Sequence, residues 1–367
     1  MQNSKKTIYY STYDDIKNPH YGGGGAIAVH EIAKRLSKKY NVHILSWDYS
    51  GKKKETIEGI AYERFGIPSL SPKLGMFAYQ IFLPFVMQQK IYDLWMESFC
   101  PPFTTAFLSK FSKKPVIGVV HMLAAEDMER KYKLPFHLIQ NFGIKTYKNF
   151  IVTSETIKKK VKEINSKGSI TIISNGIEQV QKPILRKKKY ILFLGRIEVD
   201  QKGIDLLIEA FKQFHIQNNE YQLIIAGDGD PKEIAKVNEM IKSLNLKKFV
   251  VIKGKVAGKT KESLLKNATC VVVSSRFETY SLVALEAMSH GAPLVCFAIE
   301  GLKWIPQNSA EKVKPFDTMQ LSKALLKVIS DTKHTQQMIK GGNAYAKQFT
   351  WDSIVKQYER SIENLIN

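Results

Sequence analysis

The stretch Ser274–Val295, SSRFETYSLVALEAMSHGAPLV, decides the fold class of this chain. It follows an apolar run, Thr269–Val273, whose composition predicts a buried strand. The middle of the stretch then has the apolar spacing of a helix, which Gly291 and Pro293 end. We therefore expect a strand, a turn at its carboxyl end, and a helix.

Two carboxylates bracket the predicted turn. Glu278 lies in the loop, and Glu286 follows eight positions later, about two helical turns further on. The backbone amides of Tyr280, Ser281 and Leu282 fall at the start of the helix, where a helix leaves its first amides unpaired. Such amides, together with the helix dipole, form an anion site. Because a carboxylate beside that site can accept hydrogen bonds from sugar hydroxyls, the pattern indicates a nucleotide-sugar site.

The order of these motifs resembles one known family. Glu-x7-Glu, then Ala287-Met288, then Gly291-x-Pro293 is similar to the retaining glycosyltransferases of family 4. The resemblance implies an α/β protein with the GT-B fold, in which two Rossmann-like, doubly wound parallel-sheet domains face a cleft. It also implies that Glu278 binds the donor sugar and Glu286 the ribose hydroxyls. The family usually has glycines after the first Glu, whereas this chain has Thr279 and Ser281.

Length and composition are consistent with two globular domains in a reducing compartment. The chain has 367 residues, 44% of them hydrophobic, and three scattered cysteines without a Cys-x-x-Cys motif. The N-terminus lacks the apolar core and cleavage site of a signal peptide. The longest uncharged apolar run, Leu74–Gln89, is interrupted by Gln80 and Pro84 and favours a core helix or an interfacial segment over a membrane span. We therefore expect a cytoplasmic protein.

The formal net charge of +21 requires an explanation. Nucleic acid, an anionic membrane surface and anionic small substrates are the partner classes that attract such a chain. No nucleic-acid-binding module accompanies the lysines, so nucleic acid is not expected as a partner. A solvated lysine-rich surface and attachment at the inner face of the membrane both stay open. The basic and aromatic segment Glu126–Phe150 fits a helix on a membrane or an amphipathic helix packed on the sheet.

The N-terminal half begins with a strand, a glycine loop, a helix and a second strand, at Thr7–Thr12, Gly22–Gly25, Ala26–Lys38 and Val42–Ser46. This order starts a Rossmann-like sheet. The resemblance implies that Gly23 and Gly24 let the backbone approach the donor phosphates and the acceptor. A tight turn that needs positive φ is the structural alternative.

The same glycines keep an NAD-dependent oxidoreductase open. Gly23-x-Gly25-x-x-Ala28 matches the dinucleotide fingerprint, and Asp48 follows twenty residues after Ala28. In that fingerprint, however, the glycines follow the strand at once, whereas a loop intervenes here. The fingerprint also leaves the Glu-x7-Glu stretch without a role.

His121 follows the β-branched run Pro115–Val120, which predicts a buried parallel strand. The carboxyl end of such a strand is where ligands bind in an open parallel sheet. The resemblance implies an acceptor-side histidine here, which bonds a donor hydroxyl or orients the acceptor. A structural histidine is the alternative.

The domain boundary is predicted just after Asn175-Gly176-Ile177, which resembles the family's linker. Residues 1–178 form the acceptor-side domain, and residues 179–350 form the nucleotide-sugar domain. The last segment, 351–367, has apolar residues on one helical face, and the resemblance implies that it crosses back onto the first domain.

Two cations follow the first strand of the second domain. Gly195-Arg196 and Lys202 precede a helix at Ile204–His215, a spacing that resembles the family's diphosphate clamp. Arg196 can fork onto two oxygens, and Lys202 supplies a point charge, although a surface Arg and Lys are the alternative. The resemblance implies that the backbone near Val256 meets the nucleobase.

The chain also contains Asp228-Gly229-Asp230, an Asp-x-Asp pattern that holds metal in a different glycosyltransferase fold. We interpret it as the family's Gly-Asp-Gly loop and expect no metal requirement, because the clamp residues supply the cations for the diphosphate. No resident cofactor is expected, and the donor is a nucleoside-diphosphate sugar, with UDP expected before GDP.

These observations predict a retaining glycosyltransferase that moves a sugar to a glycan or lipid-linked acceptor. The expected role is in cell-envelope polysaccharide, glycolipid or glycoprotein synthesis. A sugar-nucleotide epimerase, a non-catalytic binding subunit and the NAD-dependent oxidoreductase stay open as alternatives.

Overall fold

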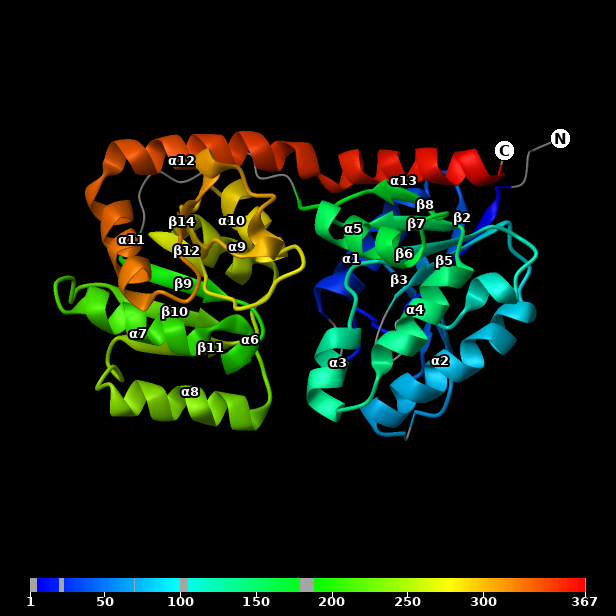
Figure 1. Ribbon diagram of the computed structural model, residues 1–367, viewed down its shortest axis with the longest axis horizontal. Coiled ribbons are helices and arrows are strands. Elements are labelled where there is room, and N and C mark those ends of the chain that lie inside the picture. The colour runs from blue at the N-terminus through cyan, green and yellow to red at the C-terminus, as the bar shows by residue number, and fades with distance from the viewer. Residues whose placement is uncertain (1–4, 20–22, 69, 100–104, 179–187, 367) are drawn as a thin grey trace. The chain divides into compact units, whose positions relative to one another are not determined.

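The computed structural model describes residues 5–19, 23–68, 70–99, 105–178 and 188–366. Gly22 of the expected glycine loop and residues 179–187 of the expected linker region lie outside the described residues. The chain divides into two compact units, coloured along the chain in Figure 1. Unit 1 comprises residues 1–176 and 351–367, and unit 2 comprises residues 177–350.

Among its described residues, unit 1 contains an eight-stranded sheet with the order β3-β4-β2-β1-β5-β6-β7-β8. Only β3 pairs antiparallel, with β4, and the other pairs of neighbouring strands are parallel. The strands span Thr7–Ser11 (β1), Asn41–Trp47 (β2), Lys54–Ile57 (β3), Ile60–Phe65 (β4), Leu94–Ser98 (β5), Val116–Val120 (β6), Asn149–Val152 (β7) and Ser169–Ile172 (β8).

The helices of unit 1 pack around this sheet. The predicted helix at Ala26–Lys38 begins two residues earlier, and Glu126–Phe150 contains two helices, because Lys133 between them has φ +57. The helical segments span Gly24–Leu36 (α1), Pro72–Gln88 (α2), Leu108–Lys110 (η1), Ala125–Tyr132 (α3), Phe136–Thr146 (α4), Glu155–Ile164 (α5) and Trp351–Ile366 (α13).

The C-terminal helix α13 belongs to unit 1, where it packs against α1. Its buried face carries Trp351, Ile354, Val355, Tyr358 and Ile362, at helical spacing. Two ion pairs flank that face, one between Arg35 and Asp352 (2.9 Å) and one between Lys39 and Glu363. Burial of the apolar face is the main stabilising term here, because exposed ion pairs contribute little.

Unit 2 contains a six-stranded parallel sheet among its described residues, with the order β11-β10-β9-β12-β13-β14. Its central strands are continuous apolar runs because helices cover parallel sheets on both faces. The strands span Tyr190–Leu194 (β9), Gln222–Ala226 (β10), Val250–Gly254 (β11), Cys270–Val273 (β12), Leu294–Phe297 (β13) and Glu311–Val313 (β14).

The order of the strands confirms the predicted doubly wound class. From β9 the chain adds β10 and β11 on one side, and then β12, β13 and β14 on the other. The order therefore reverses between β9 and β12, and ligands bind at the carboxyl ends of the strands beside such a reversal.

The helical segments of unit 2 connect these strands (Figure 1). They span Val199–Lys202 (α6), Ile204–His215 (α7), Pro231–Ser243 (α8), Gly258–Asn267 (α9), Leu282–Ser289 (α10), Glu300–Leu302 (η2), Gln307–Ser309 (η3), Thr318–Ser330 (α11), Thr332–Ala346 (α12) and Lys347–Phe349 (η4). Across the described part of both units, no helix combines the length and the apolar character that crossing a bilayer requires.

Truncating the buried face of α13 should destabilise unit 1. Ile362 is fully buried, so Ile362→Ala should lower the free energy of unfolding by about 2 to 5 kcal/mol. Urea denaturation followed by circular dichroism measures this loss. Lys356→Ala on the exposed face of the same helix is the matched control, and its effect should stay within about 0.5 kcal/mol. Equal effects of the two substitutions would contradict the packing of α13.

Candidate functional site

The candidate site of unit 2 lies where the strand order reverses, and it is formed by the loops after β9 and β12. The two loops touch through their backbones. Gly203 has φ +60, and a Cβ added there would lie 2.0 Å from the carbonyl oxygen of Ser274. Ser274 Oγ donates to the carbonyl of Lys202 (2.9 Å), and the amide of Arg276 donates to the carbonyl of Gln201 (2.9 Å). These contacts fix one loop against the other.

Lys202 and Glu278 form the centre of this site. Lys202 Nζ lies 2.7 Å from Glu278 Oε1, and Ser275 Oγ donates to the same oxygen at 2.8 Å. The two charged side chains are only 20% and 12% exposed, so water screens their attraction incompletely. The structure therefore brings together two predicted site residues that are seventy-six positions apart.

Arg196 does not join this pair. Its guanidinium donates to Gln201 Oε1 (2.8 Å) and lies 2.7 Å from Glu198 Oε2, and its side chain is 62% exposed. Both partners belong to the loop that contains Arg196 and Lys202. Only one of the two predicted clamp cations thus contacts Glu278, and the guanidinium of Arg196 is held within its own loop.

Close backbone contacts explain the glycines of the neighbouring loop after β10. A Cβ on Gly227 would lie 1.7 Å from the carbonyl oxygen of Gly195, and a Cβ on Gly229 would lie 2.2 Å from that of Ile197. Asp228 Oδ1 accepts a bond from the amide of Gly229 (2.9 Å). Within the described ranges, no group of three or more His, Cys, Asp or Glu side chains is arranged to hold a metal ion.

The start of α10 lies beside Glu278. Ser281 Oγ accepts a bond from the amide of Ala284 (3.3 Å), so this serine is the N-cap. Helix geometry leaves the amide of Leu282, the first helical residue, without an intrahelical acceptor. The ring of Tyr280 is buried and stacks on Trp304, with 4.6 Å between ring centroids. The side chains of Ser281 and Tyr280 therefore have structural roles, while the helix start presents its amides.

Glu286 and Val256 extend the candidate site toward α9. Glu286, on α10, lies 2.6 Å through Oε1 from Lys261 Nζ of α9. Val256 lies between β11 and α9 and packs, partly buried, against the core of unit 2. Lys261 is an additional cation beside the predicted ribose-binding carboxylate, and the sequence analysis did not identify it.

Arg276 is a further residue that the sequence analysis missed. Its guanidinium forms a bidentate ion pair with Asp205 (2.8 and 2.6 Å) and donates to the carbonyl of Asp200 (2.9 Å). This pair holds the loop after β12 against the start of α7. Arg276 lies two residues before Glu278, but Asp205 is seventy-one positions away, and no local pattern marks the partner.

In unit 1, Gly23 is the N-cap of α1 and Gly24 is the first residue of that helix. The φ of Gly23 is −86°, so the structural alternative of a turn with positive φ is wrong at this position. A Cβ on Gly23 would meet no described atom within 4 Å. Backbone strain therefore does not explain a glycine at position 23.

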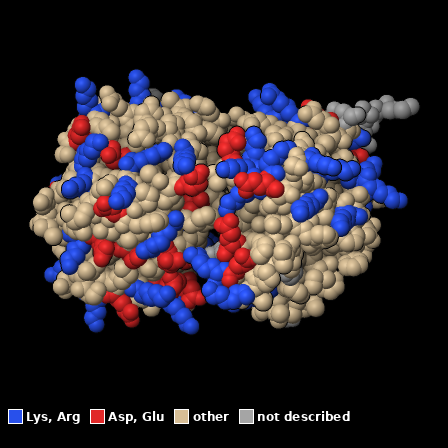
Figure 2. Space-filling view, viewed as in Figure 1, with Lys and Arg blue, Asp and Glu red and all other residues tan. Residues whose placement is uncertain are grey.

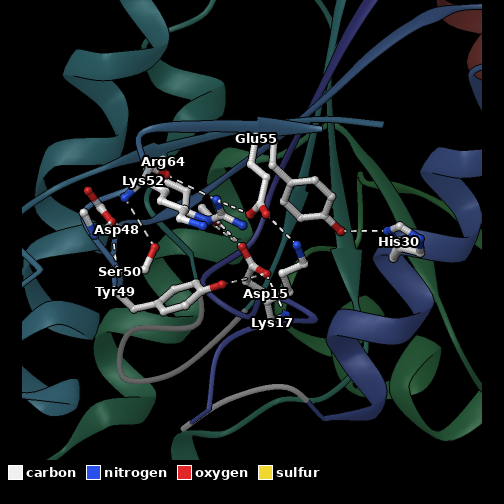
Figure 3. Close-up of polar contacts among 12 residues, drawn as sticks. Asp15, Lys17, His30, Asp48, Tyr49, Ser50, Lys52, Glu55 and Arg64 are labelled. Atoms are coloured by element: carbon white, nitrogen blue, oxygen red, sulfur yellow. Dashed lines mark hydrogen bonds and ion pairs between the residues drawn. The ribbon is translucent and has the colours of Figure 1, made fainter. Parts of the chain in front are cut away.

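The loop between β1 and α1 is anchored by a buried network, shown in Figure 3. Asp15 Oδ2 lies 2.8 Å from Arg64 Nε, and both side chains are fully buried. Tyr49 and Ser46 also donate to Asp15, at 3.5 and 3.3 Å. Asp48, the acidic residue of the dinucleotide fingerprint, accepts the amides of its own turn, including that of Ser50 (3.0 Å). Asp48 therefore has a structural role here.

Two titratable groups follow strands at the carboxyl edge of this sheet. Burial lowers the pKa of His121, after β6, to about 4, and the nearby side chain of Asn175 only partly opposes the shift. Burial raises the pKa of Asp14, after β1, to about 7. Asp14 Oδ2 lies 3.4 Å from where a Cβ on Gly25 would be. Asp14 was not among the residues predicted from the sequence, although its position three residues after the end of β1 could have identified it.

The predicted site residues are divided between the units. Unit 2 contains Glu278, Glu286, Arg196, Lys202, Gly195, Val256, Tyr280, Ser281 and Leu282, and unit 1 contains His121, Gly23 and Gly24. Within unit 2, Lys202 and Glu278 are predicted site residues that contact each other directly.

Comparison with known proteins gives two family matches that follow each other along the chain. The family described as "Glycosyltransferase Family 4" matches residues 22–180, and the family described as "Glycosyl transferases group 1" matches residues 176–345. An uncharacterized glycosyltransferase (MJ1607) of Methanocaldococcus jannaschii is 26% identical, over 92% of this chain and 94% of that protein. These matches favour a glycosyltransferase over an epimerase or an NAD-dependent oxidoreductase.

Two solved structures share the fold. Sucrose-phosphate synthase from Thermosynechococcus elongatus has a TM-score of 0.83 at 18% identity, over 98% of this chain and 99% of that one. Anabaena Alr3699/HepE in complex with UDP-glucose has a TM-score of 0.77 at 18% identity, over 98% of this chain and 100% of that one. This likeness supports the GT-B fold.

Replacing Gly203 should separate the two loops of the candidate site. Gly203→Ala would place its Cβ against the carbonyl oxygen of Ser274, and alanine is also strained at positive φ. The affinity for nucleotide should therefore be lost or fall by at least about tenfold. Gly254→Ala is the matched control, because Gly254 has φ +70 and a Cβ there would meet no described atom within 4 Å. Calorimetric titration with UDP measures the effect. Equal losses in both variants would contradict a specific role for the Gly203 contact.

His121 should make stability depend on pH. Its pKa is about 4 in the folded chain and 6.5 for an ordinary histidine, so the unfolded chain binds more protons between these values. This contribution to stability is present above about pH 6.5 and is lost as the pH falls toward 4. Between about pH 7 and pH 5, the melting temperature of the wild type should therefore fall further than that of the His121→Gln variant. Parallel melting curves of the two proteins would show that His121 is not held neutral.

Proposed function

Because the chain belongs to the group 1 glycosyltransferases and has the GT-B fold, we propose that it transfers a sugar from a nucleoside-diphosphate donor with retention at the anomeric carbon. The observation that carries this proposal is the contact of Lys202 with Glu278 at the strand reversal of unit 2. A ligand in which a phosphate is joined to a sugar could bind both groups, the phosphate at the ammonium and the sugar hydroxyls at the carboxylate.

The geometry of the pair assigns a role to each group. An ammonium has three donors, so the bond to Glu278 leaves two for phosphate oxygens. The bonds from Lys202 and Ser275 both end on Glu278 Oε1, which leaves Oε2 as an acceptor for sugar hydroxyls. Negative charge grows on the diphosphate as the anomeric bond breaks, and Lys202 and the amides at the start of α10 stabilise it.

Arg196 and Glu286 complete the proposed donor site. Among the described residues, Arg196 bonds to Gln201 and Glu198 of its own exposed loop, so it would turn onto the diphosphate when the donor binds, as a second cation. Glu286 would accept hydrogen bonds from the ribose hydroxyls, which would compete with Lys261 for its carboxylate. We propose UDP-sugar as donor before GDP-sugar, supported by the UDP-glucose of the HepE complex, with no metal or resident cofactor required.

The acceptor hydroxyl would come from unit 1. A neutral His121 can donate or accept a hydrogen bond, and Asp14 is close to half-protonated near neutral pH. We propose that both groups orient the acceptor and that the backbone of Gly23 and Gly24, at the start of α1, contacts it. The departing phosphate would act as the base in a front-face reaction.

We propose a glycan or lipid-linked acceptor and a role in cell-envelope polysaccharide, glycolipid or glycoprotein synthesis. A lipid-linked acceptor fits a basic protein that acts at the inner face of the cytoplasmic membrane.

A nucleotide screen followed by variants tests the donor site. UDP should raise the melting temperature of the wild type more than GDP, ADP or NAD do, since a ligand that binds only the native state stabilises it. Glu278→Gln and Lys202→Ala should each lower the rate of UDP release from UDP-glucose by at least about a hundredfold while the fold is kept. Arg196→Ala should lower it by about tenfold or more.

Lys327→Ala is the matched control for these variants. Lys327 is also ion-paired, with Glu311, but it belongs to α11 and contacts β14 at the sheet edge. Its substitution should leave the rate of UDP release unchanged. If Glu278→Gln or Lys202→Ala retained a rate near that of wild type, the role proposed for that residue would be wrong.

A further inference from the structure

Helix α2 has two apolar faces, of which unit 1 covers one. The stretch from Leu74 to Gln89 contains no charged residue. The side chains of Tyr79, Leu83 and Met87 are buried in the core of unit 1. The other face carries Leu74, Phe77, Ile81, Phe82 and Phe85, which are between 45% and 59% exposed.

The spacing of these exposed residues shows that they form one surface. They follow one another at intervals of three, four, one and three positions, which places them along one side of a helix. A surface helix of a globular domain normally presents polar residues on its outer side. An outward stripe of large apolar side chains marks an interaction surface.

The apolar surface continues onto η1 and α4. Helix α2 contacts η1, and Lys110 of η1 places its Nζ 4.4 Å from the ring centroid of Phe142 on α4. Phe142 and Leu138 of α4 are 55% and 59% exposed. Figure 2 shows a broad area without charged side chains where Figure 1 places α2 and α4, with basic and some acidic side chains at its borders.

Most of the charged residues around this surface are basic, although Lys90 is ion-paired with Glu63. Residues 66–92 contain two lysines, residues 98–125 contain three, and residues 130–154 contain five basic residues, and none of the three segments contains Asp or Glu. The nearby acidic residues Glu126 and Glu129 are bonded to Lys160 and His137. The surface therefore combines apolar side chains with an excess of positive charge.

We propose that α2, η1 and α4 form a docking face for a bilayer that contains anionic lipids. Helix α2 is about 25 Å long at 1.5 Å per residue and would lie in the plane of the bilayer, with its phenylalanines among the acyl chains. The lysines would contact the lipid phosphates. A second copy of the chain is a poorer occupant, because its lysines would face those of the first copy.

This inference extends the proposed function by naming the surface that meets the membrane, and its test uses neither donor nor acceptor. The full chain is floated with vesicles of phosphatidylcholine alone, or of phosphatidylcholine with roughly a third phosphatidylglycerol. We expect binding to the anionic vesicles only, and weaker binding as salt is raised.

Variants separate the apolar contribution to vesicle binding from the electrostatic one. The double substitution Phe82→Ser and Phe85→Ser should lower the partition coefficient by about tenfold or more, whereas Ile216→Ser, at a residue of unit 2 that is 75% exposed, should not change it. Lys73→Gln and Lys110→Gln should each lower it by about fivefold, with Lys356→Gln on α13 as the matched control. Unchanged melting temperatures, and an unchanged response to UDP, show that each variant is folded and that the donor site is intact.

Three results would overturn the proposal. The first is equal binding to neutral and anionic vesicles. The second is unchanged binding of the double phenylalanine variant. The third is a light-scattering measurement in which this variant converts a dimer into a monomer without an effect on vesicle binding, since the face would then join two copies of the chain.

Discussion

The backbone contact at Gly203 is the constraint on which the candidate site depends. The loops after β9 and β12 can lie so close only because residue 203 has no side chain and tolerates φ +60. That closeness allows Lys202, the residue before it, to reach Glu278. Gly227, in the loop after β10, likewise allows close packing against the loop after β9, because a Cβ on it would meet the carbonyl of Gly195. Close backbone packing therefore positions the charged side chains.

Much of unit 2 was predictable because its signals are local. A buried parallel strand is a continuous apolar run, and the predicted strand Tyr190–Leu194 coincides with β9. The turn before α10 follows from the order of strand, Glu278 and helix in the quoted stretch. The doubly wound class follows from the repetition of such units, and the family resemblance added the roles of Lys202 and Glu278.

The rest depends on partners far away in the sequence. Nothing near Arg276 indicates that Asp205 will bind it, and nothing near Arg196 indicates that its guanidinium will stay within its own loop. The two faces of α2 show the same difficulty. An uncharged apolar helix has no polar side that could reveal its orientation, so its sequence cannot say which stripe the core will cover.

The arrangement of charges also distinguishes the explanations for the basic composition. In the candidate donor site each described cation lies against an acid: Lys202 with Glu278, Lys261 with Glu286, Arg276 with Asp205, and Arg196 with Glu198. These four pairs add nothing to the net charge of +21. The three segments around α2, η1 and α4 contribute ten basic residues and no acidic ones. The paired cations of the donor site therefore do not explain the excess charge, whereas residues 66–154 as a whole, with ten basic and five acidic residues, contribute part of it.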